Sequence, residues 1–247
     1  MRRMELPIEW LPAEGRPEQL ILLLHGWRHD GRAMAPLARA LRDAFPQAAV
    51  LAPDSPLAFV RSSAGAGGGD PGDEPGRDLG RMWYSIKDLS EANWPDRVAA
   101  CLPPLLAWVR AQQQRLGVAP AATALGGFSQ GAVLALAAAL RDDGLAGRVL
   151  AFGGSLVLPG PAGRAPQQTT VHLFHGGADA VFPAEHARRA LQWFGEHDGD
   201  ATLDVAEGVG HELHPALIDC ALHRLTHHIP LRTWRAALGA VPGAPMQ

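Results

Sequence analysis

The sequence has few of the features that mark several common protein classes. Its two cysteines, Cys101 and Cys220, are too few for a disulfide framework in 247 residues. The net charge is only −3, so we expect neither a nucleic-acid partner nor stable membrane anchoring. The longest strongly apolar run covers nine residues, Ala132 to Leu140, whereas a membrane-spanning helix needs about 20. The N-terminus has no apolar core of a signal peptide, and we expect a cytoplasmic monomer or homodimer.

Metal ligation is also poorly supported by the sequence. The chain has 11 histidines, but none pairs convincingly with acids or cysteines at ligand spacing. His211 with His214, and His223 with His227, are better explained as features of a helix start and a helix surface. We therefore expect no metal and no cofactor.

Strand and helix patterns alternate along the chain, which predicts a mostly parallel sheet with helices on both faces. Expected strands cover residues 20–24, 48–52, 121–126, 148–152, 170–174 and 201–205, and expected helices cover 32–45, 91–116, 132–140, 183–194 and 213–229. Pro103 and Pro104 predict a kink or a division of the second helix. We expect a single domain over residues 1–247.

Two segments interrupt this alternation. Residues 61–80 are rich in glycine, which predicts a mobile loop. The loop is either a permissive insertion or the edge of a lid, because Trp83 follows shortly after it. Residues 239–247 have little to bury and predict a frayed tail.

The most informative stretch is Gly127-Phe128-Ser129-Gln130-Gly131. It matches G-x-S-x-G, and it lies between an expected strand and an alanine-rich helix. A serine on a sharp turn from strand to helix is the nucleophile elbow of the α/β-hydrolase fold. That fold needs an acid and then a histidine on later strand ends, in that order. Asp179 and His211 fulfil this, so we expect a Ser129–His211–Asp179 triad.

Other residues could compete for two of these roles. Asp204 lies in the middle of an expected strand, where its side chain points to one face of the sheet, so Asp179 is preferred. His214 precedes Pro215 at a helix start, and His172 lies inside a strand and predicts a packed core histidine.

Acyl transfer also needs hydrogen-bond donors for the developing oxyanion. The backbone N–H of Gln130, directly after the serine, is one such donor in an elbow. The loop after residues 20–24 should supply the second, and Gly26 allows the turn that points the N–H of Trp27 inward. For the His25 side chain we expect a structural role with bonds to nearby backbone.

Taken together, four motifs resemble those of the phospholipase/carboxylesterase family, which includes acyl-protein thioesterases and small bacterial serine esterases. They are Leu24-His25-Gly26, Gly127 to Gly131, His175 to Asp179, and Gly210-His211. The bacterial esterases are the most similar branch, through Trp83-Tyr84-Ser85. The resemblance covers residues 20–229 and implies an α/β-hydrolase fold. One departure is Arg28, where the family usually has glycine.

The resemblance implies a loop with leucine and proline, here residues 153–159, along the acyl side of the substrate pocket. We therefore expect Leu156, Leu158, Trp27 and Trp83 to line that pocket. The expected function is a serine hydrolase, a carboxylesterase that acts on small short-chain acyl esters. Acyl-thioesterase or lysophospholipase activity is the alternative, and a hydrolase-like receptor or interaction protein is the non-enzymatic one.

Overall fold

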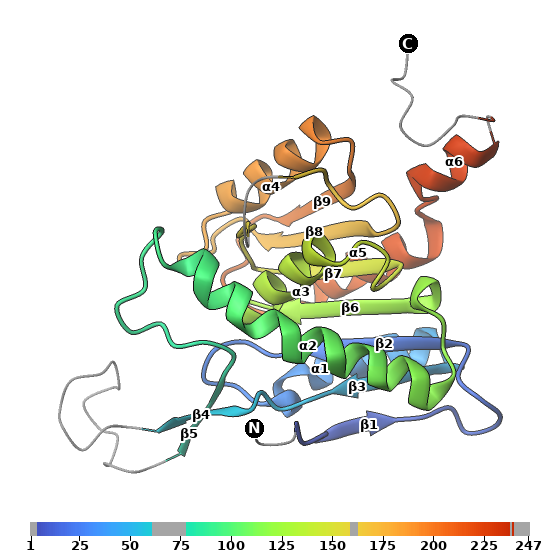
Figure 1. The fold of residues 1–247 in the computed structure, drawn as a ribbon, viewed down its shortest axis with the longest axis horizontal. Helices are drawn as coiled ribbons and strands as arrows, with labels where there is room; N and C mark the ends of the chain where they lie inside the picture. Colours follow the sequence, from blue (N-terminus) through green and yellow to red (C-terminus); the bar gives the residue numbers. More distant parts are fainter. Residues whose placement is uncertain (1–3, 61–77, 159–162, 238, 240–247) are drawn as a thin grey trace.

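The computed structural model describes residues 4–60, 78–158, 163–237 and 239. Within this part of the chain, seven strands form a sheet in the order β1-β3-β2-β6-β7-β8-β9 (Figure 1). β1 pairs antiparallel with β3, and the other neighbours pair in parallel. The strands are β1 (Ile8–Trp10), β2 (Gln19–Leu24), β3 (Ala48–Ala52), β6 (Thr123–Phe128), β7 (Arg148–Phe152), β8 (Thr170–Gly176) and β9 (Asp200–Ala206). β4 (Leu57–Val60) and β5 (Asp78–Met82) form a separate antiparallel pair.

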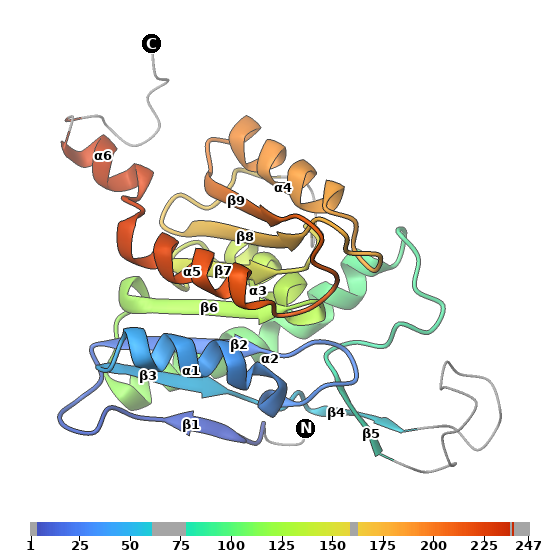
Figure 2. The ribbon, with the colours of Figure 1, turned by 180° about the vertical axis from the view of Figure 1, so that it is seen from behind.

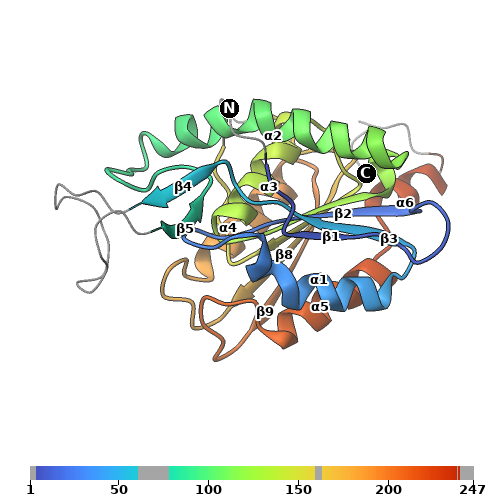
Figure 3. The ribbon, with the colours of Figure 1, turned by 90° about the horizontal axis from the view of Figure 1, so that it is seen from below.

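Helices cover both faces of the large sheet, as expected from the alternating pattern. The helices are α1 (Ala35–Ala44), α2 (Trp94–Leu116), α3 (Gln130–Arg141), α4 (Glu185–Glu196), α5 (Pro215–His227) and α6 (Leu231–Ala237), with 3₁₀ turns at Gly31–Met34 and Pro120–Ala122. α2 and α3 lie on one face, and α1 and α5 lie on the other (Figures 2 and 3). No helix in the described ranges is long and apolar enough to cross a membrane.

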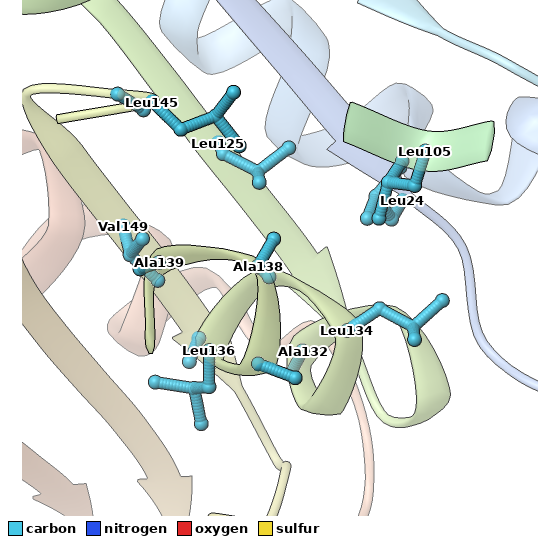
Figure 4. Packing of buried hydrophobic residues seen from close by; sticks show 14 of the residues in the cluster. Leu24, Leu105, Leu125, Ala132, Leu134, Leu136, Ala138, Ala139, Leu145 and Val149 are labelled. Atoms are coloured by element: carbon cyan, nitrogen blue, oxygen red, sulfur yellow. The ribbon is translucent and has the colours of Figure 1, made fainter. Parts of the chain in front are cut away.

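The apolar core follows the same two faces. α3 is buried along most of its length, and its alanines and leucines pack beside Leu125 of β6 and Val149 of β7 (Figure 4). A second cluster joins Leu37 and Leu41 of α1 to Leu217 of α5 on the opposite face. Because β2 and β3 are covered on both sides, every residue from 20 to 24 and from 48 to 52 is buried.

The structure corrects several predicted boundaries. α2 starts at Trp94 and is not divided, because it runs through Pro103 and Pro104. A proline removes the bond to the carbonyl four residues earlier, and one of the two carbonyls released here belongs to exposed Ala100, where water can replace it. The first expected helix is a 3₁₀ turn followed by α1. β8 continues through Gly176, two residues beyond the expected end at 174, so His175 lies in the strand.

The glycine-rich loop was predicted over residues 61–80. Residues 78–80 instead belong to β5, which pairs with β4. Residues 61–77, which make up most of the predicted loop, and residues 240–247, which make up most of the predicted tail, lie outside the described residues.

Candidate active site

The expected elbow is present at the carboxyl end of β6. Ser129 directly follows the strand and has φ 56° and ψ −118°, a backbone conformation that residues other than glycine rarely adopt. The glycines on either side of it are required because no space is left there for a side chain. A Cβ on Gly127 would lie 2.2 Å from the carbonyl carbon of Gly131, and one on Gly131 would lie 2.1 Å from the carbonyl oxygen of Leu24. The elbow therefore brings α3, β6 and the end of β2 into direct backbone contact.

Ser129, His211 and Asp179 form one continuous hydrogen-bond chain. The Nε2 atom of His211 lies 2.9 Å from the Oγ atom of Ser129, and its Nδ1 atom lies 2.7 Å from the Oδ2 atom of Asp179. Asp179 follows β8 and His211 follows β9, so parallel pairing of the strands brings the three residues together. The sequence placed them at strand ends, and the structure places their side chains within bonding distance.

The carboxylate of Asp179 is buried and held by its own turn. Its Oδ1 atom accepts hydrogen bonds from the backbone N–H groups of Val181 and Phe182, both at 2.8 Å. His175, which the sequence analysis did not assign, donates from Nε2 to the carbonyl of Phe182 at 2.6 Å. Burial lowers the pKa of His175, which favours its neutral form. These contacts leave the Oδ2 atom of Asp179 directed at His211.

The competing residues have other partners. Asp204 forms two hydrogen bonds of 2.9 Å with Arg224 of α5. His214 caps α5, where its Nδ1 atom accepts from the N–H of Ala216. His172 is fully buried in β8 and bonds the Oγ1 atom of Thr202, as expected for a core histidine.

The loop after β2 lies against the nucleophile. A Cβ on Gly26 would be 3.3 Å from the Cβ atom of Ser129, so the residue before Trp27 packs directly against the serine. Gln130 is the first residue of α3, and the N–H groups in the first turn of a helix have no partner inside the helix. One predicted oxyanion donor thus follows Ser129 in the chain, and the other follows the glycine that packs against Ser129.

Arg28, at the position where the family usually has glycine, has a backbone conformation that favours glycine. Its φ is 60°, which costs a non-glycine residue free energy. Its guanidinium lies 5.5 Å from the ring centre of Trp27 and 5.6 Å from that of Phe59 in β4. These cation–π contacts attach the loop to the β4–β5 pair, and they offset part of the backbone cost.

The residues predicted to line the substrate pocket have different surroundings. Leu156 and Leu158 are partly exposed in the loop after β7, and Trp27 packs edge-on against Phe59 at 5.4 Å. Trp83 is only 4% exposed and lies beside the ring of His25. It also borders an apolar cavity of about 290 Å³ between β4 and α2, which neither Ser129 nor His211 lines.

Across the described ranges, no group of three or more histidine, cysteine or acidic residues is arranged to hold a metal ion. His223 and His227, the histidine pair at helical spacing, stack on each other on α5 at 4.3 Å.

Known proteins with similar sequences point to one family. The family model described as Phospholipase/Carboxylesterase matches residues 11–229. Esterase YpfH of Escherichia coli (strain K12) is 37% identical over 228 residues, which cover 92% of this chain and 90% of that protein. Acyl-protein thioesterase 1 of Eremothecium gossypii is 33% identical over 108 residues, 40% of this chain and 44% of its own.

Solved structures show the same fold. Esterase PE8 has a TM-score of 0.75 at 27% identity, over 92% of this chain and all of that one. The Bacillus cereus carboxylesterase has a TM-score of 0.69 at 13% identity, over 89% and 92% of the two chains. The predicted α/β-hydrolase fold is therefore confirmed. The serine elbow and these relatives show that the chain is an enzyme of the serine hydrolase type. It belongs to the phospholipase/carboxylesterase family.

Proposed function

We propose that this protein is a serine carboxylesterase that hydrolyses short-chain acyl esters through a Ser129–His211–Asp179 triad. The observation that carries the proposal is the unbroken chain of hydrogen bonds from Asp179 through His211 to Ser129. No cofactor takes part in the proposed reaction.

The proposed reaction follows from the donors and acceptors in this chain. His211 removes the proton of Ser129 as the Oγ atom attacks the acyl carbonyl, and then gives that proton to the leaving alcohol. Asp179 keeps the proton of His211 on Nδ1 and stabilises the imidazolium. Water then attacks the acyl-enzyme by the same route, releasing the acid.

The N–H groups of Trp27 and Gln130 are the proposed oxyanion donors. Two features support them: Gly26 packs against Ser129, and the first N–H groups of α3 have no partner inside the helix. Donors fixed in place before the reaction stabilise charge that develops only in the transition state, and therefore raise kcat.

The short-chain preference rests on the bulk around the loop. Trp27 follows the glycine that packs against Ser129, and its large ring is confined by Phe59 and Arg28. Leu156 and Leu158 form the apolar wall of the proposed slot. Each methylene buried in such a slot gains about 0.8 kcal/mol until the slot is full.

Acyl-thioesterase activity is the second candidate, because acyl-protein thioesterases are among the relatives. The test is a panel of p-nitrophenyl esters from acetate to palmitate, run beside the matching acyl thioesters. We expect kcat/KM to peak among the short esters. An optimum at dodecanoate or longer, or a clear preference for thioesters, would favour the second candidate.

A serine-reactive fluorophosphonate separates the enzyme from a hydrolase-like receptor. We expect covalent labelling of the wild type and none of Ser129→Ala. Ligand binding without labelling or turnover would support the receptor.

A further inference from the structure

The side chain of Gln130 has a role separate from that of its backbone. Its amide is buried, and the residue is only 4% exposed. The Oε1 atom accepts from the backbone N–H of Trp83 at 3.1 Å, and the Nε2 atom donates to the carbonyl of Tyr84 at 3.0 Å. Both polar ends of the amide therefore bind the backbone just after β5, across 46 and 47 positions of sequence.

Trp83 continues this connection to the other side of the site. Its Nε1–H donates to the carbonyl oxygen of His25 at 2.8 Å, and its ring lies 5.2 Å from the ring of His25. His25 is the residue before Gly26 and Trp27. One end of the connection is thus the residue after the nucleophile, and the other end is the loop that carries Trp27.

The ring of His25 is fixed in turn by two backbone groups. Its Nε2 atom accepts from the N–H of Ser55 at 3.0 Å, so the proton of the neutral ring is on Nδ1. From there it donates to the carbonyl of Gly26 at 2.7 Å. Trp83 therefore holds the carbonyl of His25, and the ring of His25 holds the carbonyl of the peptide between Gly26 and Trp27, so His25 has the structural role that the sequence predicted.

We propose that Gln130, Trp83 and His25 form an oxyanion clasp, a set of positioning residues that fixes the N–H of Trp27 relative to the N–H of Gln130. This inference rests on the proposed function. The polar atoms of the clasp are bonded to protein backbone, so these side chains act through the two donors and not by touching the substrate.

The clasp has a specific kinetic consequence. Oxyanion donors act on charge that is present only in the transition state, so displacing them lowers kcat and leaves KM nearly unchanged. A displacement of the order of 1 Å at a reacting centre can cost about 100-fold in rate. The triad side chains keep their own hydrogen bonds, so the pH at half-maximal activity should not move.

The chain offers a matched control for Gln130. Gln113 of α2 is also buried, and its Nε2 atom donates to the Oγ1 atom of Thr123 and to the carbonyl of Leu145. Thr123 begins β6, at the end of the strand opposite Ser129. Gln113→Met therefore removes a comparable pair of side-chain hydrogen bonds, at a place far from the proposed oxyanion donors.

The experiment compares Gln130→Met with Gln113→Met by melting temperature, kcat, KM and affinity for a trifluoromethyl ketone, which forms a tetrahedral oxyanion adduct with a serine nucleophile. We expect both variants to melt at lower temperature. Only Gln130→Met should lose kcat, by about 10- to 100-fold, with ketone affinity falling in parallel. Equal kcat in the two variants, or a loss confined to KM, would overturn the clasp.

Trp83→Phe is the second variant and decides the question if Gln130→Met does not fold. It retains an aromatic ring beside His25 and removes the Nε1–H group that donates to the carbonyl oxygen of His25. We expect kcat and ketone affinity to fall about tenfold at constant KM. Unchanged kcat would refute the clasp. If Ser129→Ala retains full activity, the proposed function itself has failed, whatever the clasp variants show.

Discussion

Replacing Asp179 by asparagine tests the proposed acid most directly. The Oδ1 atom of Asp179 accepts from the N–H groups of Val181 and Phe182. An asparagine in this position would keep its oxygen there, because its amino group cannot accept those bonds. The amino group would then face the Nδ1 atom of His211, which must become the acceptor. The proton of His211 would lie on Nε2, and the ring could no longer take the proton of Ser129.

The expected loss follows from this change of tautomer. In serine-histidine-aspartate triads, the same substitution lowers kcat by about 10⁴-fold, which corresponds to about 5.5 kcal/mol. We expect a loss of that order in Asp179→Asn, measured with a short p-nitrophenyl ester. KM should change little, because Asp179 is buried behind His211.

Asp204→Asn is the matched control. Its carboxylate binds Arg224 at the partly exposed edge of β9 and α5, and such ion pairs contribute about 0.2 to 1 kcal/mol. This variant should unfold slightly earlier on heating, with kcat within about twofold of wild type. If Asp204→Asn lost more activity than Asp179→Asn, the proposed triad would be wrong.

Three other predictions follow. Ser129→Ala should keep its melting temperature within a few degrees and lose hydrolysis by several powers of ten, and retained turnover would rule out the serine mechanism. Trp27→Ala should move the ester optimum toward longer chains, whereas an unchanged optimum would show that Trp27 does not limit the acyl chain in the pocket. Burial, and then the nearby His228 and Arg148, lower the pKa of His172 to about 3. Between pH 6.5 and 3, His172 is therefore protonated in the unfolded chain and neutral in the folded protein. The free energy of unfolding falls as pH drops through this range. His172→Gln should weaken that dependence by up to about 3 kcal/mol between pH 6.5 and 4 in urea titrations, and identical curves would contradict the argument.

The parts of this protein that were predictable from sequence are those with local signals. The apolar runs at 20–24 and 48–52 are strands with those bounds or one residue more, because burial on both faces leaves no polar position in them. The elbow was recognisable because its two glycines, Gly127 and Gly131, have to lie two positions before and after the serine. Ser129, Asp179 and His211 could be chosen because each follows a strand whose neighbours run in parallel.

The clasp and the β4–β5 pair had no such signal. Gln130 binds the backbone near Trp83 through its side chain, and a contact between a side chain and a distant backbone leaves no periodic trace in sequence. β4 and β5 are short and widely separated in the chain, so their pairing could not be read from alternation. Helix α2 was expected to kink or divide at its prolines, but it is not divided, because one released carbonyl lies at an exposed position and α2 packs on α3.

The spacing at the elbow also affects how relatives of this chain should be interpreted. Gly127 and Gly131 are imposed by backbone atoms little more than 2 Å from where a side chain would start, and this crowding exists whether or not residue 129 reacts. A descendant that lost Ser129 would still need both glycines in order to fold. In a comparison of homologues, the two glycines therefore trace common architecture, while the members of the proposed triad, the serine, the aspartate after β8 and the histidine after β9, would trace retained chemistry. Relatives that keep the first set and lose the second would be inactive members with an intact scaffold.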